Sequence, residues 1–437
     1  MGDVLQIIPV IHGLKKKYHD ASIHVLVSEG YRCLLDGNPC VDRVISIPLD
    51  ALNWYLTTPG GIRRAQTIID PLVETLDREK YDLIITRQFS MFEMCLLGAL
   101  NTENILGPYY APESDLAYWR WKLWNCIRDE FPTKKLVYHA DNMTVEHTQR
   151  ITQNRRKYQK NLVDVGLDMT GVPDAKTFYV PITSKQREWA KQVFRDAGFE
   201  GQRVLGVQTC ASEGYRYLTL DMIVETLDQW QDRWKGRLVF FGSGDERERV
   251  KSVIMRLKRP EMAMNLAGET SLLELGACLE QVDLLMTPDT GTLHMAAAVN
   301  TPTVSLFFSS AYPWQTGPYG KNHLMLYSEL PCSPCRNPEK CVYDGFCRSL
   351  HTPSSVAGVL DFGFELLSQK IGKNKDKLIS KWKDHFAAEY RARRMHVLYT
   401  GWQEIARPLV LQDLTVEPEE TEPDLMTCQD RVPVKAV

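Results

Sequence analysis

The chain has 437 residues, of which 44% are hydrophobic and 24% are charged, and its formal net charge is −3 at pH 7. This length exceeds what one hydrophobic core usually fills, which predicts two domains plus an appendage, and the charge excludes global attraction to nucleic acid. No apolar run approaches the roughly 20 residues of a transmembrane helix, and the start has no basic leader or small-residue cleavage site of a secretory signal.

Short apolar segments alternate with helical segments along the first half. Segments rich in Ile, Val and Leu on both faces, as buried parallel strands are, fall at 23–29, 44–48, 82–87 and 104–108. Helices are expected at 61–80 and, with a basic character, at 146–167. A segment with two prolines at 172–183 precedes a new helix from Ser184. We therefore place a domain boundary near residue 175.

The second half repeats the alternation. Strands are expected at 203–209, 237–243, 282–288 and 303–308, and helices near 219–233, 245–257, 271–280 and 291–299. Strands that alternate with helices imply right-handed crossovers and a parallel sheet covered on both faces. The sequence thus predicts an α/β protein with two Rossmann-like, doubly wound domains, 1–175 and 176–352, that face a cleft.

The character of the chain changes after residue 352. We expect C-terminal helices over 353–406, the first at 353–370 and then a lysine- and arginine-rich amphipathic stretch at 371–406. The last segment, 407–437, is acidic at first and contains prolines, which predicts a disordered tail.

The start of the chain departs from the doubly wound pattern. Such a domain opens with a strand whose end carries the first ligand loop, whereas this chain begins at the loop, with Gly2 and Asp3, and continues as a helix. One interpretation is that a first strand of about ten residues precedes Met1. The alternative is a trimmed first domain.

The segment 287–307, TPDTGTLHMAAAVNTPTVSLF, carries a possible ligand loop. An apolar strand ends at Pro288, a turn follows, and a helix of small residues begins near Gly291. The N-terminus of such a helix offers unpaired N–H groups and a partial positive charge to a phosphate, and a glycine there allows close approach. The alternative is a plain turn in which Asp289 or Thr290 only caps the helix; His294 would then simply pack.

Several motifs in order resemble glycosyltransferase family 9, which contains the ADP-heptose:lipopolysaccharide heptosyltransferases. They are Gly2-Asp3-Val4-Leu5 followed by Pro9, the segment 24–45, the segment 289–307, TGPYG at 316–320 and CSPC at 332–335. The resemblance spans roughly residues 1–370. It implies the GT-B fold of that family, in agreement with the tandem α/β pattern.

The resemblance also implies roles for individual residues. Asp3 falls on the general base for the acceptor hydroxyl, with an N-cap as its alternative role. Donor-binding roles fall on residues near the phosphates, the ribose and the heptose: Thr209, Glu246, Asp289, Thr290, Gly291 and His294. Tyr215 replaces a lysine that neutralises the leaving phosphate in the family. Arg216 beside it either takes that catalytic role or is a solvated arginine.

These residues suit one inverting displacement at the anomeric carbon. A positioned carboxylate would assist the acceptor hydroxyl, worth about 10²–10⁴ in rate, and a cation with a helix N-terminus would stabilise the leaving diphosphate. The sequence has no Asp-x-Asp in a metal-dependent context, so we expect no cofactor for catalysis.

The eleven cysteines predict free thiols in a reducing compartment, which agrees with a cytoplasmic location. Four of them form a C-x2-C-x5-C-x5-C loop within 332–347: Cys332, Cys335, Cys341 and Cys347. This spacing suits a structural zinc or iron with four thiolate ligands, and similar iron-binding loops occur in part of the family. Free or disulfide-linked thiols are the alternative.

The partners that the resemblance implies are a nucleotide-diphosphate sugar, ADP-heptose, and a glycolipid acceptor in the lipopolysaccharide core. An aromatic and cationic stretch at 118–124 suits peripheral contact with the inner membrane, or a half-buried helix. Two other functions stay open, a heptosyltransferase that modifies autotransporter proteins and a catalytically silent nucleotide-sugar-binding protein.

Overall fold

The computed structural model describes most of the chain from Met1 to Thr400. The described residues are 1–86, 91–102, 104–107, 109–110, 136–137, 160–172, 178–211, 214–308, 311–328, 330, 333, 335, 341, 345–368, 375–390 and 395–400. The expected boundary near residue 175, most of the basic stretch 146–167, the segment 118–124 and the tail 407–437 lie outside them.

A seven-stranded sheet forms the second half, in the order β13-β12-β11-β10-β7-β8-β9. Its strands are β7 (Val204–Gln208), β8 (Arg237–Phe241), β9 (Ala263–Asn265), β10 (Leu284–Pro288), β11 (Thr303–Phe307), β12 (His323–Ser328) and β13 (Met395–Thr400). All neighbours are parallel except β12 and β13. The four strands predicted here from the sequence are therefore confirmed.

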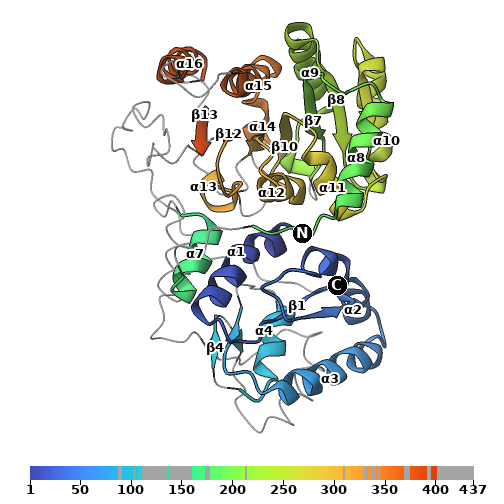
Figure 1. The fold of residues 1–437 in the computed structure, drawn as a ribbon, viewed down its shortest axis with the longest axis vertical. Coiled ribbons are helices and arrows are strands. Elements are labelled where there is room, and N and C mark those ends of the chain that lie inside the picture. The colour runs from blue at the N-terminus through green and yellow to red at the C-terminus, as the bar shows by residue number, and fades with distance from the viewer. Residues whose placement is uncertain are drawn as a thin grey trace, which may run out of the picture.

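Helices cover both faces of this sheet (Figure 1). They are α8 (Ser184–Asp196), α9 (Leu220–Trp234), α10 (Arg247–Arg256), α11 (Leu272–Leu279), α12 (Gly291–Ala298) and α15 (Pro353–Ser368). The helices α9, α10 and α15 share one apolar cluster with the sheet, and α8, α11 and α12 share another. Thr183, Thr219 and Ser271 cap their helices with side-chain hydrogen bonds, which explains why these starts could be predicted.

The first half contains smaller paired strands with helices around them. Its strands are β1 (His24–Ser28) parallel to β2 (Arg43–Ile47), β3 (Ile84–Ile85) parallel to β4 (Ile105–Leu106), and β5 (Tyr109–Tyr110) antiparallel to β6 (Leu136–Val137). Its helices are α1 (Gly2–Lys17), η1 (Glu29–Leu34), α2 (Leu49–Thr57), α3 (Ile62–Glu79), α4 (Met91–Gly98) and α7 (Leu162–Thr170). The predicted strands and the helix at 61–80 are confirmed.

Helix α1 lies between the two halves, below α12 in Figure 1. Leu5, Ile8 and Ile11 of α1 belong to the same buried cluster as Ile182 and Met295. One hydrophobic core therefore spans both halves at this side of the molecule, rather than two cores separated by solvent.

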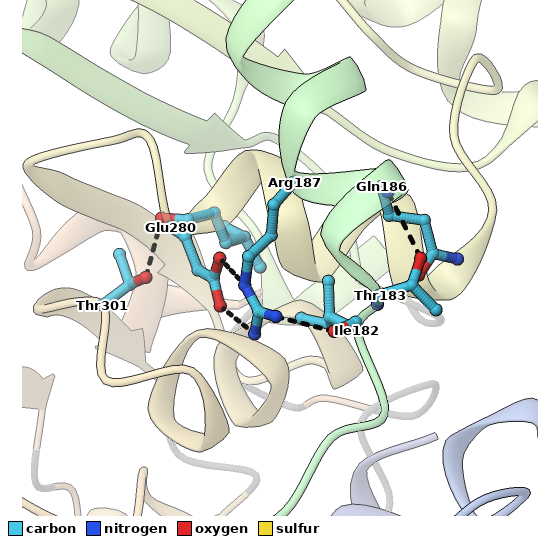
Figure 2. Close-up of polar contacts among 7 residues, drawn as sticks. Ile182, Thr183, Gln186, Arg187, Glu280 and Thr301 are labelled. Carbon is cyan, nitrogen blue, oxygen red and sulfur yellow. Dashed lines mark hydrogen bonds and ion pairs between the residues drawn. The ribbon is translucent and has the colours of Figure 1, made fainter.

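The chain enters the second half through a segment that is fixed to α11 and its C-terminus. The guanidinium of Arg187 donates to the carbonyl of Ile182 at 2.7 Å and to both carboxylate oxygens of Glu280 at 2.8 and 3.0 Å; Figure 2 draws these contacts. A Cβ added at Gly276 would lie 2.8 Å from Ile182 Cδ1. The glycine therefore lets the entering chain pack closely on α11.

The expectation of helices throughout 353–406 is wrong in part. Helices α15 and α16 (Lys375–Tyr390) form, but Met395–Thr400 is the edge strand β13, antiparallel to β12. Val397 and Leu398 are both buried, in clusters on opposite faces of the sheet. Neighbouring residues that are buried on opposite sides fit the period of a strand, because a helix would place them only about 100° apart around its axis. No helix among the described residues is long and apolar enough to cross a membrane.

Candidate active site

The N-terminus of α1 meets the N-terminus of α12 at the carboxyl end of β10. A Cβ added at Gly2 would lie 2.7 Å from Cδ2 of His294, and one added at Gly291 would lie 2.5 Å from Cε of Met1. The missing side chains thus allow the two helix ends to touch. Asp3 follows Gly2 directly and is exposed, so its carboxylate lies beside the start of α12.

The turn before α12 does not have a simple capping role. Thr290 is the N-cap of α12 but makes no side-chain capping hydrogen bond. Its hydroxyl lies 3.4 Å from the hydroxyl of Thr287. Similarly, Met1 rather than Asp3 is the N-cap of α1. Neither α1 nor α12 therefore begins with a side-chain capping hydrogen bond from Asp3, Asp289 or Thr290.

Asp289 is the charged centre of the site. Its Oδ2 accepts a hydrogen bond from the hydroxyl of Thr316 at 3.2 Å, and its Oδ1 lies 4.0 Å from Nε2 of His294. Burial raises the pKa of Asp289 to about 6, while Arg216 and the Thr316 hydroxyl oppose this rise and the charge of Asp3 adds to it. Asp3, Arg216 and Asp289 are therefore near enough to interact electrostatically.

His294 is buried and uncharged. Burial lowers its pKa to about 4, although the charge of Asp3 opposes this shift. Nε2 of Gln6, one turn after Asp3 on α1, lies 3.3 and 3.2 Å from the two ring nitrogens. A neutral imidazole offers one donor and one acceptor, so His294 can orient an oxygen of a ligand but does not bring a full positive charge.

Positive charge comes instead from Arg216, at the end of the short helix η2 (Gly214–Arg216). Its guanidinium lies 5.8 Å from the ring centre of Tyr215 and acts on the pKa of Asp289. The arginine is thus near the site, beside Tyr215. The N–H groups at the start of α12 add a partial positive charge.

Glu246 is fixed at the end of the neighbouring strand β8. It ends the short helix η3 (Gly244–Glu246), where its Oε2 accepts from the backbone N–H of Ser243 at 2.7 Å and from Nε2 of Gln208 at 3.1 Å. Thr209, at the end of β7, is buried, with its hydroxyl 3.5 Å from Sγ of Cys210. All these residues follow carboxyl ends of parallel strands, where open α/β sheets bind ligands.

Three residues of this arrangement escape sequence reasoning: Gln6, Gln208 and Thr316. Gln6 and Gln208 are polar residues in otherwise apolar stretches, and this is the only feature of the sequence that could have indicated a role for them. Thr316 opens the TGPYG motif, but its partner Asp289 lies 27 residues earlier. Their roles depend on contacts between distant segments.

The four-cysteine loop is described only in part, since Cys332 lies outside the described residues. Cys335, Cys341 and Cys347 are partly buried free thiols, and Sγ of Cys341 accepts a hydrogen bond from the N–H of Gly345 at 3.2 Å. Within the described residues, no three potential ligands are grouped closely enough to hold a metal ion.

Sequence comparison relates the chain to heptosyltransferases. Residues 141–344 match glycosyltransferase family 9 (heptosyltransferase). Lipopolysaccharide heptosyltransferase 3 of Escherichia coli is 25% identical over 339 residues, which cover 76% of this chain and 88% of that protein. Lipopolysaccharide heptosyltransferase 1 of Pseudomonas aeruginosa is 23% identical over 354 residues, which cover 78% of this chain and 85% of that protein.

Solved structures support the same fold. The glycosyltransferase family 9 protein of Veillonella parvula superposes with a TM-score of 0.57 at 16% identity, over 83% of this chain and 94% of that chain. ADP-heptose lipopolysaccharide heptosyltransferase II of E. coli superposes with a TM-score of 0.52 at 16% identity, over 83% and 96% of the two chains. The expected GT-B architecture of two facing α/β halves is thus confirmed.

Proposed function

Since residues 141–344 match glycosyltransferase family 9 (heptosyltransferase), we propose that this chain transfers a heptose from ADP-heptose to an acceptor of the lipopolysaccharide core. The observation that carries the proposal is the meeting of α1 and α12. It brings an exposed carboxylate, Asp3, to a buried set of polar groups around Asp289 and His294.

The donor diphosphate would lie at the start of α12. Thr290 and Gly291 would present backbone N–H groups to the phosphates, and neutral His294 would hold an oxygen of the diphosphate or the heptose. Arg216 would stabilise the charge that develops as the bond to the nucleotide breaks. Glu246 would accept hydrogen bonds from the ribose hydroxyls, and Thr209 would lie near the phosphates. In this proposal protein groups supply all of the positive potential, and no metal takes part.

Asp3 would act on the acceptor. Its carboxylate would take the proton of the acceptor hydroxyl as this oxygen attacks the anomeric carbon on the face opposite the diphosphate, so that the configuration inverts. Asp289 is unsuited to this role, because it is buried and bound to Thr316. Its place beside His294 suits hydrogen bonds to the heptose.

The substitution Asp3→Asn tests this proposal. It removes the base but keeps the shape, so turnover of ADP-heptose onto a heptose-deficient core acceptor should fall about 100-fold or more, with ADP affinity in calorimetry unchanged. Asp20→Asn, at an exposed position, is the control and should leave turnover intact. Equal turnover in Asp3→Asn would contradict the role of Asp3. Transfer only to a polypeptide acceptor would instead indicate a protein heptosyltransferase, and binding without transfer a silent protein.

We also propose that the loop 332–347 binds a structural zinc or iron through its four cysteines. The hydrogen bond from Gly345 to Sγ of Cys341 suits a thiolate ligand, since backbone N–H groups commonly support ligands from the second layer around a metal. Elemental analysis of the purified protein should find about one metal ion per chain, and Cys341→Ser should lose it. A metal-free wild-type protein would contradict this proposal.

A further inference from the structure

Gln208 joins two parts of the donor site through a buried side chain. It ends β7, and only 5% of its surface is exposed. Its Oε1 accepts from the hydroxyl of Thr292 at 3.1 Å, and its Nε2 donates to Oε2 of Glu246 at 3.1 Å and to the carbonyl of Cys210 at 3.2 Å. The amide therefore bridges α12 and the segment that carries Glu246.

The orientation of this amide is set by its partners. A carboxylate only accepts hydrogen bonds, so Nε2 must face Glu246, and the oxygen must then face Thr292, whose hydroxyl can donate. A rotated amide would place its oxygen against the carboxylate and leave two buried groups badly paired. The hydrogen bonds therefore run in one direction, from the hydroxyl of Thr292 to Gln208 and from Gln208 to Glu246.

Glu246 itself has little freedom. The backbone N–H of Ser243 holds the same oxygen, Oε2, at 2.7 Å, and a Cβ added at Gly242 would lie 2.5 Å from it. The carboxylate therefore lies close over the backbone at Gly242. Gln208 supplies a side-chain hydrogen bond that orients this carboxylate, and the thiol of Cys210 lies beside it.

We propose that Gln208 is a positioning residue that holds Glu246 in the orientation needed to recognise the ribose hydroxyls, and that ties this carboxylate to the helix at the diphosphate. The inference rests on the donor site proposed above. It predicts that recognition of the ribose, rather than of the phosphates, depends on Gln208, because only the Glu246 end of the bridge is a carboxylate, which can accept hydrogen bonds from ribose hydroxyls.

Calorimetry with ADP, 2′-deoxy-ADP and 3′-deoxy-ADP on the full chain tests this inference. The wild type should bind ADP about tenfold more tightly than at least one deoxy analogue, as expected for the loss of one charge-assisted hydrogen bond. The variant Gln208→Met keeps the length of the side chain without its polar atoms. It should bind ADP about tenfold more weakly and lose most of this discrimination, while the deoxy analogue binds almost as before.

Gln231→Met is the matched control, because Gln231 is also buried but donates to the carbonyl of Gly236, just after α9. It should keep the full ratio between ADP and the deoxy analogues. A second test combines Gln208→Met with Glu246→Gln. The double variant should show the same ratio of affinities for ADP and the deoxy analogue as Glu246→Gln alone. If Gln208→Met does not fold, Thr292→Val removes the other end of the bridge and should reduce the ratio in part.

The outcomes separate the two proposals. If Gln208→Met keeps the wild-type ratio of affinities for ADP and the deoxy analogue, the role of Gln208 is overturned while the donor site stands. The same holds if the ratio falls equally in the Gln231→Met control. Additive losses in the double variant would also overturn it, because they would mean that the two residues act independently. A wild type that does not bind ADP would overturn the proposed donor site and, with it, this inference.

Discussion

Three histidines are buried within the described part of the chain and are held uncharged. Burial lowers the pKa of His294 to about 4 and that of both His323 and His351 to about 3. His323 lies 3.0 Å from the hydroxyl of Thr303, whereas neither ring nitrogen of His351 has a hydrogen-bond partner. The ring of His351 packs edge-on against Phe308, 4.9 Å between centres. Its position is therefore maintained by apolar packing.

These lowered pKa values predict acid sensitivity. Below pH about 6.5 these histidines bind protons in the unfolded chain, whereas they stay neutral in the folded chain. The free energy of unfolding therefore falls as the pH falls. Between pH 7 and 5 each histidine contributes a loss of about 2 kcal/mol. Asp289, whose pKa is raised to about 6, acts in the opposite direction, as do Glu93, Asp283 and Asp361, whose pKa values are also raised by burial. Urea unfolding at pH 7 and 5 measures the net slope.

His351→Leu isolates one of these contributions. It should unfold with a shallower dependence on pH than the wild type, because an apolar side chain of similar size takes no proton in the unfolded state. His19→Leu is the control, since His19 is exposed and should leave the slope unchanged. Equal slopes in the wild type and His351→Leu would mean that His351 can be protonated in the folded protein.

At the scale of elements, α7 holds the loop that follows α13 (Pro313–Thr316). Asn161, the N-cap of α7, donates to the carbonyl of Gly317 at 3.1 Å, and the hydroxyl of Tyr319 donates to Asp164 at 2.6 Å. Burial and the hydrogen bond to Asp164 raise the pKa of Tyr319, so its hydroxyl stays protonated. A helix of the first half thereby fixes the loop that directly follows Thr316, the partner of Asp289.

Tyr319→Phe should loosen this loop. A hydrogen bond to a charged acceptor contributes about 1.5–3 kcal/mol, and the variant should lose stability in that range. The donor KM should rise more than kcat falls, because Thr316 would hold Asp289 less firmly. Tyr179→Phe removes a more exposed hydroxyl from the neighbouring segment and should change neither quantity. A Tyr319→Phe variant with normal donor KM would show that the loop is held by other contacts.

Local patterns predicted the elements well but not the contacts between them. The strand ending at Pro288 and the helix from Gly291 follow from an apolar run, a turn and small residues, all within a short window. The pairing of Gln6 with His294 joins positions 288 residues apart, and no local period records it. Strand β13 was missed because its stretch is also basic and amphipathic, and only burial on both faces of the sheet explains it.

At the scale of the whole molecule, the two halves are not independent. The cluster that contains Leu5 and Ile8 of α1 also contains Ala190, Phe241 and Met295 of the second half. The salt bridge between Arg187 and Glu280 fixes the entering chain on the same side (Figure 2). Movement of the halves about this side would have to disrupt close packing, which interiors resist.

Ile8→Ala should therefore destabilise the protein as a whole. The side chain is completely buried, and its loss should cost about 2–5 kcal/mol. Calorimetry should show one unfolding transition in the wild type and the same single transition, at lower temperature, in the variant. Met255→Ala, at an exposed position on α10, should leave the transition in place. Two separate transitions, of which Ile8→Ala shifted only one, would contradict a shared core.

The position of β13 has a consequence for how copies of this protein meet. The strand is antiparallel to β12 along its whole length, from Ser328 paired with Met395 to His323 paired with Thr400. Without β13, one row of amide and carbonyl groups on β12 would face water, together with the apolar side chains beside it. Such an unpaired edge can pair with strands of other molecules. A chain cut before residue 395 would consequently tend to stack into insoluble assemblies through β12, whose side chains β13 helps to keep buried.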